Sequence, residues 1–197
     1  IINLYDFTNK SFKQLYAGTG VQDAVICDNG NVYIAKSSAS NPQVPLICVN
    51  PDTYETVPLS LNGNVSFGLS TDGHLVYGIV LQSNDNVQTT YVYSFNTSTN
   101  KATMLLKFNQ EDAEAFTYIY GNILYTNIGK NNLYCYNITT KKNLKYNRSA
   151  SIPKSVAQNG NRVVILNDNG SISWCSSNNA TLQADWYLTT DQQWYEF

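Results

Sequence analysis

The chain has 197 residues, a net charge of −2 and only 13% charged side chains, so its length fits a single domain with a core of its own. The 12 Lys and Arg residues form no cluster, whereas binding to a phosphate backbone needs a basic surface. No apolar run approaches the roughly 20 residues that cross a bilayer as a helix. We therefore expect neither nucleic-acid binding nor membrane insertion. The abundance of Asn, Ser, Thr and Tyr favours an extracytoplasmic protein, secreted or on the cell surface.

Two kinds of turn alternate from the N-terminus onward. The first segments, "INLYDF" and "SFKQLYA", predict two strands joined by a polar turn that begins at Asp6, and similar turns recur at spacings of 44, 46 and 41 residues, at Asn50, Asn96 and Asn137. Between them lie turn glycines at spacings of 43, 48 and 39 residues: Gly30, Gly73, Gly121 and Gly160. Each glycine stands between two alternating apolar segments. Because Asn-Gly and Asp-Gly supply the positive φ of a tight hairpin, each block predicts a β-hairpin.

Two hairpins in each period of about 43 residues predict a unit of four strands. Periods of about 40 to 50 residues with four strands are the signature of a β-propeller, in which each four-stranded blade covers its faces by stacking on its neighbours. With the strands of a blade named a to d from the axis outward, the complete blades are expected over residues 23–61, 66–108, 114–146 and 154–183. The fold class expected is therefore all-β, with antiparallel blades.

The two ends of the chain complement each other in this scheme. The N-terminus supplies only strands c and d, and the C-terminal segments "DWYLTT" and "QWYEF" align with strands a and b. Joining them predicts one domain over residues 1–197, a five-bladed ring in which N-terminal strands c and d are closed by C-terminal strands a and b. Two alternatives stay open: a segment of a larger propeller with six to eight blades, and another all-β form such as a sandwich.

The segments "GNILYTNIGKNNLYCYNITTKK" and "NGNVYIAK" with "LICVNPDTYE" resemble the repeats of quinoprotein-like and YVTN-like propellers. Such blades carry a Gly, a short aromatic strand, a Leu-Tyr strand and an Asn/Asp-x-x-Thr turn. The resemblance covers most of the chain and implies a propeller fold. Quinone-dependent dehydrogenases share the blade pattern, but this sequence has no adjacent Cys pair, so we expect no such cofactor.

The single histidine and the four cysteines fit structural positions. His74 occupies the turn position that Asn31, Asn122 and Asn161 hold in other blades, so we expect an exposed turn residue and neither Ser-His-Asp nor Cys-His catalysis. Cys48, Cys135 and Cys175 share one site near the end of strand c. Cys27 lies two strands, roughly 9.5 Å, from Cys48, beyond the roughly 7 Å between Cα atoms that a disulfide spans. We expect free, buried thiols.

A ring of polar residues is predicted at one mouth of the axial channel. The register seven residues before each turn places five residues at the starts of the innermost strands: Asp23, Ser66, Glu114, Pro153 and Asp185. Paired acids among Asp23, Glu114 and Asp185 suit general acid and base catalysis on a glycosidic bond, and their oxygens suit Ca²⁺. The alternative is that they are solvated residues at loop ends.

The longer and more variable connections are predicted at that same mouth, whereas the opposite turns are short. Variable loops on one face of a rigid scaffold are typical of a recognition surface. The sequence thus favours a non-enzymatic binding or scaffold module for a protein or glycan, without a metal or cofactor unless Ca²⁺ binds there. The expected binding residues are Asp23, Gln43, Glu111, Asp112, Glu114 and Lys154. A glycan-active hydrolase or lectin and a structural segment of a larger protein are the alternatives, and no oligomeric state is indicated.

Overall fold

A computed structural model of the chain describes all residues except 37–45, 60, 62–63, 66–67, 85–86, 110–115, 129–131, 148–151, 179–180, 189–193 and 197. For residues 64–65, 83–84, 132, 144–147, 174–178, 181–188 and 194–196 it describes the backbone alone. Every regular element in this part of the chain is a β-strand. The described residues include no helix that could span a membrane.

The strands form five antiparallel sheets that follow one another along the chain. The first is a hairpin of β1 (Ile2–Asp6) and β2 (Ser11–Tyr16). The second sheet has the order β3 (Val21–Ile26), β4 (Val32–Lys36), β5 (Leu46–Val49) and β6 (Thr56–Leu59). In the third sheet two short strands, β7 (Asn64–Val65) and β8 (Ser70–Thr71), both pair with β9 (Leu75–Asn84), which is followed by β10 (Val87–Asn96) and β11 (Lys101–Asn109).

The last two sheets repeat this up-and-down order. The fourth sheet consists of β12 (Thr117–Tyr120), β13 (Ile123–Asn127), β14 (Asn132–Asn137) and β15 (Lys142–Asn147). The fifth sheet consists of β16 (Pro153–Asn159), β17 (Arg162–Asn167), β18 (Ile172–Asn178), β19 (Thr181–Leu188) and β20 (Trp194–Glu196). The predicted all-β class and its antiparallel, four-stranded repeat are thereby confirmed.

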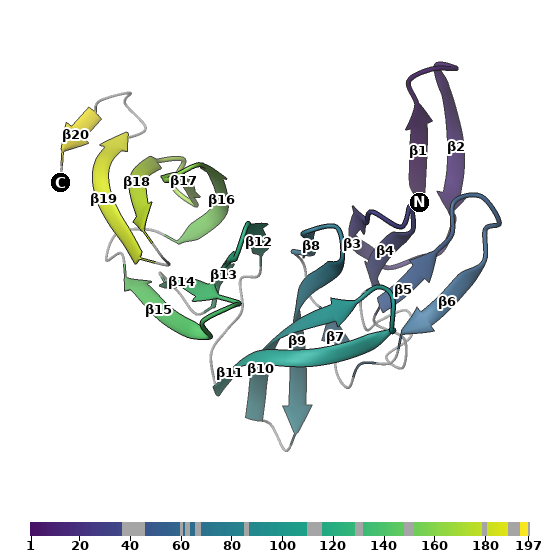
Figure 1. Cartoon of the computed structure of the whole chain (residues 1–197), viewed down its shortest axis with the longest axis horizontal. Coiled ribbons are helices and arrows are strands. Elements are labelled where there is room, and N and C mark those ends of the chain that lie inside the picture. Colours follow the sequence, from purple (N-terminus) through teal and green to yellow (C-terminus); the bar gives the residue numbers. More distant parts are fainter. Residues whose placement is uncertain are drawn as a thin grey trace.

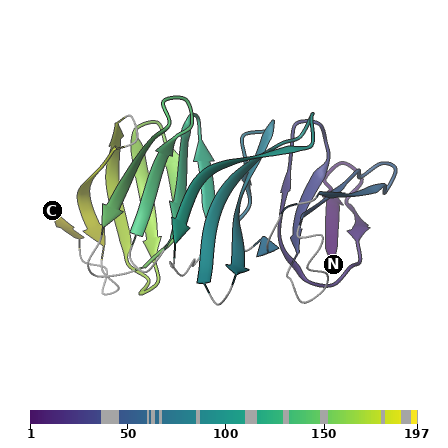
Figure 2. The same cartoon turned by 90° about the horizontal axis from the view of Figure 1, so that it is seen from below.

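The sheets are arranged as a fan of blades (Figure 1). Strands β3, β8, β12 and β16 lie innermost, and each contacts the next along the fan. Figure 2, seen from below, shows the same sheets standing side by side along the long axis of the molecule. Figure 1 also shows that the fan is open between the first and fifth sheets.

Four apolar clusters hold the fan together, one between each pair of successive sheets. Side chains alternate between the two faces of a strand, so each middle strand serves two clusters. In β4, Ile34 packs toward the first sheet and Tyr33 toward the third. In β13, Leu124 packs toward the third sheet and Tyr125 toward the fifth. This double use is the physical reason for the aromatic and aliphatic alternation in the sequence.

The turns between the third and fourth strands of each unit share one hydrogen-bond pattern. A side-chain oxygen accepts hydrogen bonds from the backbone N–H groups two and three residues later, and this occurs at Asp6, Asn50, Asn96 and Asn137. The residue four positions after each has a positive φ of 52° to 61°. The same contacts lower the pKa of Asp6, with the Asn9 N–H as the largest cause. These Asx turns confirm the repeat predicted from the sequence.

Replacing Asn96 by Ala is expected to lower the free energy of unfolding by about 1 kcal/mol, because two backbone donors lose their acceptor. Those donors are Ser98 N–H at 3.0 Å and Thr99 N–H at 2.9 Å from Asn96 Oδ1. Urea denaturation followed by circular dichroism measures the change. The control is Ser98→Ala, which keeps the backbone N–H at an exposed site and should leave stability unchanged.

The C-terminal strands differ from the prediction. β19 pairs with β18 from Thr181 to Leu188 and β20 pairs with the outer edge of β19, so both strands belong to the fifth sheet. The predicted innermost position of Asp185 is wrong, because Asp185 lies in the fourth strand of that sheet. The reason is that apolar residues alternate from 182 to 188, so a single strand runs past the expected end at Gln183, and a register shift opposite Trp174 and Cys175 accommodates Asp185 as a bulge. Among the described pairs, β1 pairs with β2 alone.

Candidate functional site

The strand ends form two rims with different connections. The turn rim carries the hairpin turns at the four glycines and the four Asx turns. The loop rim carries eight connections between successive sheets and between the second and third strands of a unit, which span two to nine residues between strand ends: 17–20, 37–45, 60–63, 85–86, 110–116, 128–131, 148–152 and 168–171. The strand ends thus put the variable connections on one side, where the sequence places the candidate binding residues.

Most of those candidates fall outside the described residues: Gln43, Glu111, Asp112 and Glu114. The side chain of Asp185 is likewise not described. Of the predicted set, the structure therefore describes the side chains of Asp23 and Lys154. Lys154 is exposed near the start of β16, and Asp23 is partly buried in β3, so the two lie on innermost strands of different sheets.

The carboxylate of Asp23 ties two sheets together. Its Oδ2 accepts hydrogen bonds from the backbone N–H of Gly68 at 3.0 Å and of Leu69 at 2.8 Å. Its Oδ1 accepts a hydrogen bond from Ala24 N–H at 2.8 Å. Gly68 and Leu69 lie between β7 and β8, where Gly68 has a φ of 90° and the innermost strand of the third sheet is broken. Asp23 thus satisfies two backbone donors that the break releases.

Other polar groups also bridge neighbouring sheets. Thr117 N–H donates to Gly68 O at 3.0 Å, and the Thr117 hydroxyl lies 2.9 Å from Ser70 Oγ. Asn127 Nδ2 donates to Pro153 O at 2.5 Å, which joins the fourth sheet to the fifth. Sequence reasoning missed these bridges. The signal available was a polar residue at the loop-rim end of an otherwise apolar strand.

Two amide oxygens at the loop rim are buried without a hydrogen-bond partner among the described residues: Asn127 Oδ1 and Asn167 Oδ1. Asn127 is fully buried at the end of β13, and Asn167 is 2% exposed at the end of β17. Each amide nitrogen is engaged, with Asn167 Nδ2 donating to Ser171 Oγ at 3.0 Å. Unpaired acceptors of this kind carry a desolvation cost.

Burial favours the neutral forms of Tyr33 and of the Cys27 and Cys48 thiols. Burial raises the pKa of Tyr33 to about 12 and also raises the pKa of the Cys27 and Cys48 thiols. A protonated thiol is a poor nucleophile. Cys27, Cys48 and Cys135 are free and buried as predicted, whereas the side chain of Cys175 lies outside the described part. Within that part no three His, Cys, Asp or Glu residues are grouped to hold a metal ion.

His74 is an exposed turn residue, as the sequence predicts. Its side chain is 83% exposed, and Nε2 lies 3.8 Å from Asp28 Oδ2. The side chain of Asp28 is itself 65% exposed, and an ion pair between exposed groups contributes little to stability.

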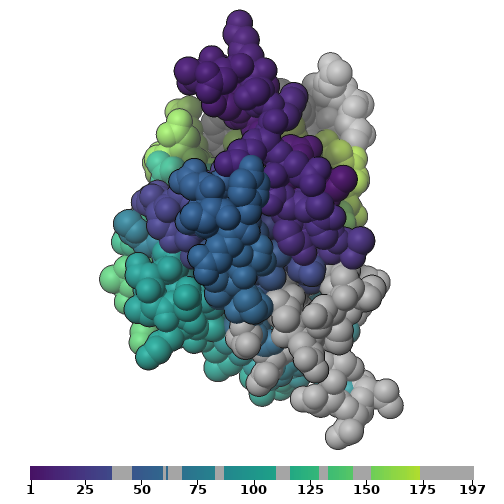
Figure 3. All heavy atoms as spheres, turned by 90° about the vertical axis from the view of Figure 1, so that its right-hand side faces the viewer, coloured from purple at the N-terminus to yellow at the C-terminus, as the bar shows by residue number. Residues whose placement is uncertain are grey.

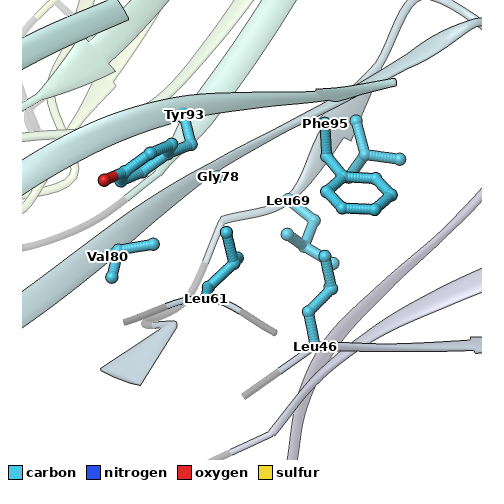
Figure 4. Close-up of a pocket in the computed structure, with 8 residues that line it drawn as sticks. Leu46, Leu61, Leu69, Gly78, Val80, Tyr93 and Phe95 are labelled. Carbon is cyan, nitrogen blue, oxygen red and sulfur yellow. The ribbon is translucent and has the colours of Figure 1, made fainter. Parts of the chain in front are cut away.

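A small apolar cavity lies between the second and third sheets. Its volume is about 10 Å³ and its lining is almost entirely apolar, so it has room for little more than one water-sized group. Figure 4 shows side chains of both sheets gathered beside the backbone of Gly78; the lining residues are Leu46, Leu61, Leu69, Val76, Gly78, Val80, Tyr93 and Phe95. The cavity is a packing gap rather than a ligand site.

Filling this gap by Gly78→Ala is expected to raise the free energy of unfolding by about 0.5 to 1 kcal/mol. Glycine inside a strand costs backbone entropy, and Gly78 shares a face of β9 with Val76 and Val80, so the added methyl group points at the cavity. Thermal unfolding measures the gain. A lower melting temperature would show that the facing side chains leave no room.

Comparison with solved structures supports the fold. The N-terminal domain of Nup159 has a TM-score of 0.56 and 12% identity, over 86% of this chain and 44% of that one. The S. cerevisiae complex of Dbp5 with Nup159 and Gle1 gives a TM-score of 0.56 and 12% identity over 87% and 45% of the two chains. The mitotic checkpoint complex has a TM-score of 0.53 and 9% identity, over 99% of this chain and 81% of that one. The chain spans less than half of the first two. These are propeller-type folds, and at such identities the likeness concerns the fold alone.

Sequence comparison adds a family match and a bacterial relative. A family described as an uncharacterised protein matches residues 118–189, which cover the fourth sheet and most of the fifth. An uncharacterized protein of Treponema pallidum (strain Nichols) is 31% identical over 87 residues, which make up 44% of this chain and 95% of that protein. Because the match covers nearly all of the Treponema protein, this chain belongs to the same family.

Proposed function

We propose that the protein is a non-enzymatic binding or scaffold module that engages a protein partner through its loop rim. The observation that carries this proposal is the contrast between the rims. The Asx turns repeat one geometry on the turn rim, whereas the strand ends of the loop rim are separated by connections of two to nine residues. A rigid scaffold with variable connections on one side suits recognition of a macromolecule.

The side chains around the innermost strands favour binding over catalysis. The Asp23 carboxylate accepts hydrogen bonds from three backbone N–H groups, so we assign it a structural role. Among the solved structures of similar fold, one has Dbp5 bound to Nup159, which supports a protein as the partner class. Binding of Ca²⁺ and a location outside the cytoplasm stay predictions.

We further propose that the fan is part of a larger propeller ring. In the other four sheets, strands lie between the axis and the third strand of the unit. β1 corresponds to a third strand, but among the described pairs it pairs with β2 alone. β19 and β20 extend the fifth sheet and, in the described part of the chain, do not pair with β1. This favours a ring of six to eight blades over a closed ring of five blades.

Partner capture by loop-rim and turn-rim variants tests the binding proposal. The loop-rim variant combines Gln43→Ala, Asp112→Ala and Lys154→Ala. Proteins captured by the immobilised wild-type chain are identified by mass spectrometry, and the affinity of the recovered partner is measured for each variant. We expect the loop-rim variant to lose at least about tenfold in affinity without a change in melting temperature.

A turn-rim variant provides the matched control. Ser98→Ala, Thr139→Ala and Asn161→Ala change three exposed residues of that rim and should leave the affinity unchanged. Equal losses in both variants, or a loss confined to the turn-rim variant, would contradict the proposal.

A further inference from the structure

The outer edge of one sheet carries an additional strand. In the fifth sheet, β20 pairs antiparallel with the outer edge of β19, which is the fourth strand of its unit. Among the described strands, the other sheets end at the fourth strand of the unit: β2, β6, β11 and β15. A strand at the edge of a sheet presents unpaired backbone N–H and C=O groups and is a template for a further strand. The question is which of these edges resembles that of β19.

The edge that β20 joins lies directly after a β-bulge. The pairing of β19 with β18 skips Asp185, and β20 pairs with the next three residues, 186–188. β11 has the same feature, because its pairing with β10 skips Leu105 and then continues over residues 106–109. A bulge bends the strand and increases its twist, so the edge after the bulge is turned relative to the edge before it. Residues 106–109 of β11 therefore correspond to the part of β19 that carries β20.

The outermost strands of the other sheets lack this combination. β2 has a bulge at Leu15 but ends at the next residue. β6 has four residues and includes Pro58, which has no N–H to donate, and β15 pairs with β14 without a register shift. β11 has nine residues without Pro and, among the described strands, pairs with β10 alone. It lies on the outside of the fan in Figure 1, and Figure 3 shows residues of this part of the chain, in teal, at the surface.

Contacts with the fourth sheet hold the segment after the bulge in place. The ring of Phe108 lies 4.7 Å from that of Tyr134, measured between centroids. Leu106 and Phe108 both pack against the cluster between the third and fourth sheets. An edge that is already fixed needs little further ordering when a partner binds, and such preorganisation favours affinity.

The charges around this edge favour an acidic partner. Lys107 lies in the middle of the segment after the bulge, with an exposed side chain whose Nζ is 5.8 Å from the centroid of the Tyr91 ring. Within the described part of the chain Lys107 forms no ion pair. The sequence has no Asp or Glu from residue 86 to 110 or from 116 to 167. A carboxylate brought to this edge therefore meets a positive charge and no acidic residue of these segments.

We propose that residues 106–109 of β11 bind an extended acidic segment of a protein partner, which adds to the third sheet as β20 adds to the fifth. Backbone hydrogen bonds provide the affinity in strand addition of this kind. A carboxylate opposite Lys107 forms a cross-strand pair of opposite charges and selects acidic segments. The site lies on the outside of the fan and does not depend on the loop-rim function.

Binding of a short peptide to the full chain tests this inference. The peptide has the sequence of residues 191–197, DQQWYEF, which contains the β20 strand and two acidic residues. Fluorescence anisotropy of the labelled peptide should show saturable binding. Lys107→Glu in the chain places like charges on neighbouring strands and should lower the affinity about fivefold. Tyr195→Pro in the peptide removes a backbone donor from the strand and should lower the affinity at least about tenfold.

Lys101→Glu in the chain is the matched control. Lys101 is an exposed lysine of the same strand, before the bulge. Six residues of extended strand, roughly 20 Å, separate it from Lys107. This distance exceeds the Debye length of about 8 Å at physiological ionic strength, so the affinity should stay within about twofold of wild type. Both chain variants should unfold at the wild-type temperature.

Hydrogen exchange identifies the strand that the peptide joins. Binding should protect backbone N–H groups among residues 106–109 and leave those of β15 unchanged. No saturable binding at about 1 mM peptide would overturn the inference, as would full affinity of the Tyr195→Pro peptide. Equal losses in Lys107→Glu and Lys101→Glu would overturn it too, because they would indicate non-specific charge attraction. An affinity that Lys107→Glu does not change would mean that the peptide replaces β20 on β19. Lys107→Glu should still capture the loop-rim partner, so the two proposals fail separately.

Discussion

Replacing Asp23 by Ala is expected to lower the free energy of unfolding by about 2 to 3 kcal/mol, because two partly buried backbone donors lose a charged acceptor. The donors are the N–H groups of Gly68 and Leu69, which lie where the innermost strand of the third sheet is interrupted. Urea denaturation at neutral pH measures the loss. The result decides whether Asp23 belongs to the scaffold or to a ligand site.

Asp28→Ala is the matched control, since Asp28 follows the same strand β3 but has an exposed side chain opposite His74. We expect a change of less than about 1 kcal/mol. If Asp23→Ala were as mild as this control, the carboxylate would be free to serve a ligand, and its role as a bridge between sheets would be wrong.

The repeat could be predicted from the sequence because its signals are local. The oxygen of Asn96 or Asn137 reaches N–H groups only two and three residues away, so the turn is encoded within five residues. The glycine turns behave similarly, with φ of 53° at Gly121 and 61° at Gly160. Strand alternation between these turns then defines the faces and hence the four clusters.

The bridges between sheets could not be predicted because they join distant parts of the chain. Asp23 binds N–H groups 45 and 46 residues away, and these groups are available only because the strand breaks at Gly68. The repeat alignment treats that segment as a regular innermost strand. The position of Asp185 was missed for a different reason: alternation is the same in every strand of a blade, so the pattern does not tell the fourth strand from the first.

The same contrast between local and long-range contacts applies to the candidate site. Its outline, a rim of variable connections, follows from the turns and is seen in the strand ends. Its chemistry depends on side chains whose partners come from neighbouring sheets, as at Asp23, Thr117 and Asn127. These polar residues make their hydrogen bonds within the scaffold, so the binding proposal places recognition on the connections beyond the strand ends.

Replacing Asn127 by Asp is expected to destabilise the protein by at least about 3 kcal/mol at neutral pH, because it buries an unpaired charge. Asn127 is fully buried, and its Nδ2 donates to Pro153 O. In the variant a carboxylate oxygen faces that carbonyl oxygen, and the donor is lost. Chemical denaturation measures the difference from wild type, and Asn122→Asp, at an exposed turn residue, should leave stability nearly unchanged.

The stability lost in the Asn127→Asp variant should depend on pH. Burial disfavours the carboxylate, so the pKa of the new Asp in the folded state should rise above its unfolded value of about 3.9. The protonated form is therefore favoured by folding, and the loss relative to wild type should shrink as the pH falls through the folded-state pKa. At low pH the carboxyl O–H can again donate to Pro153 O. A loss of stability that is small at neutral pH, or that does not shrink on acidification, would contradict the buried hydrogen bond from Asn127 to Pro153 O between the fourth and fifth sheets.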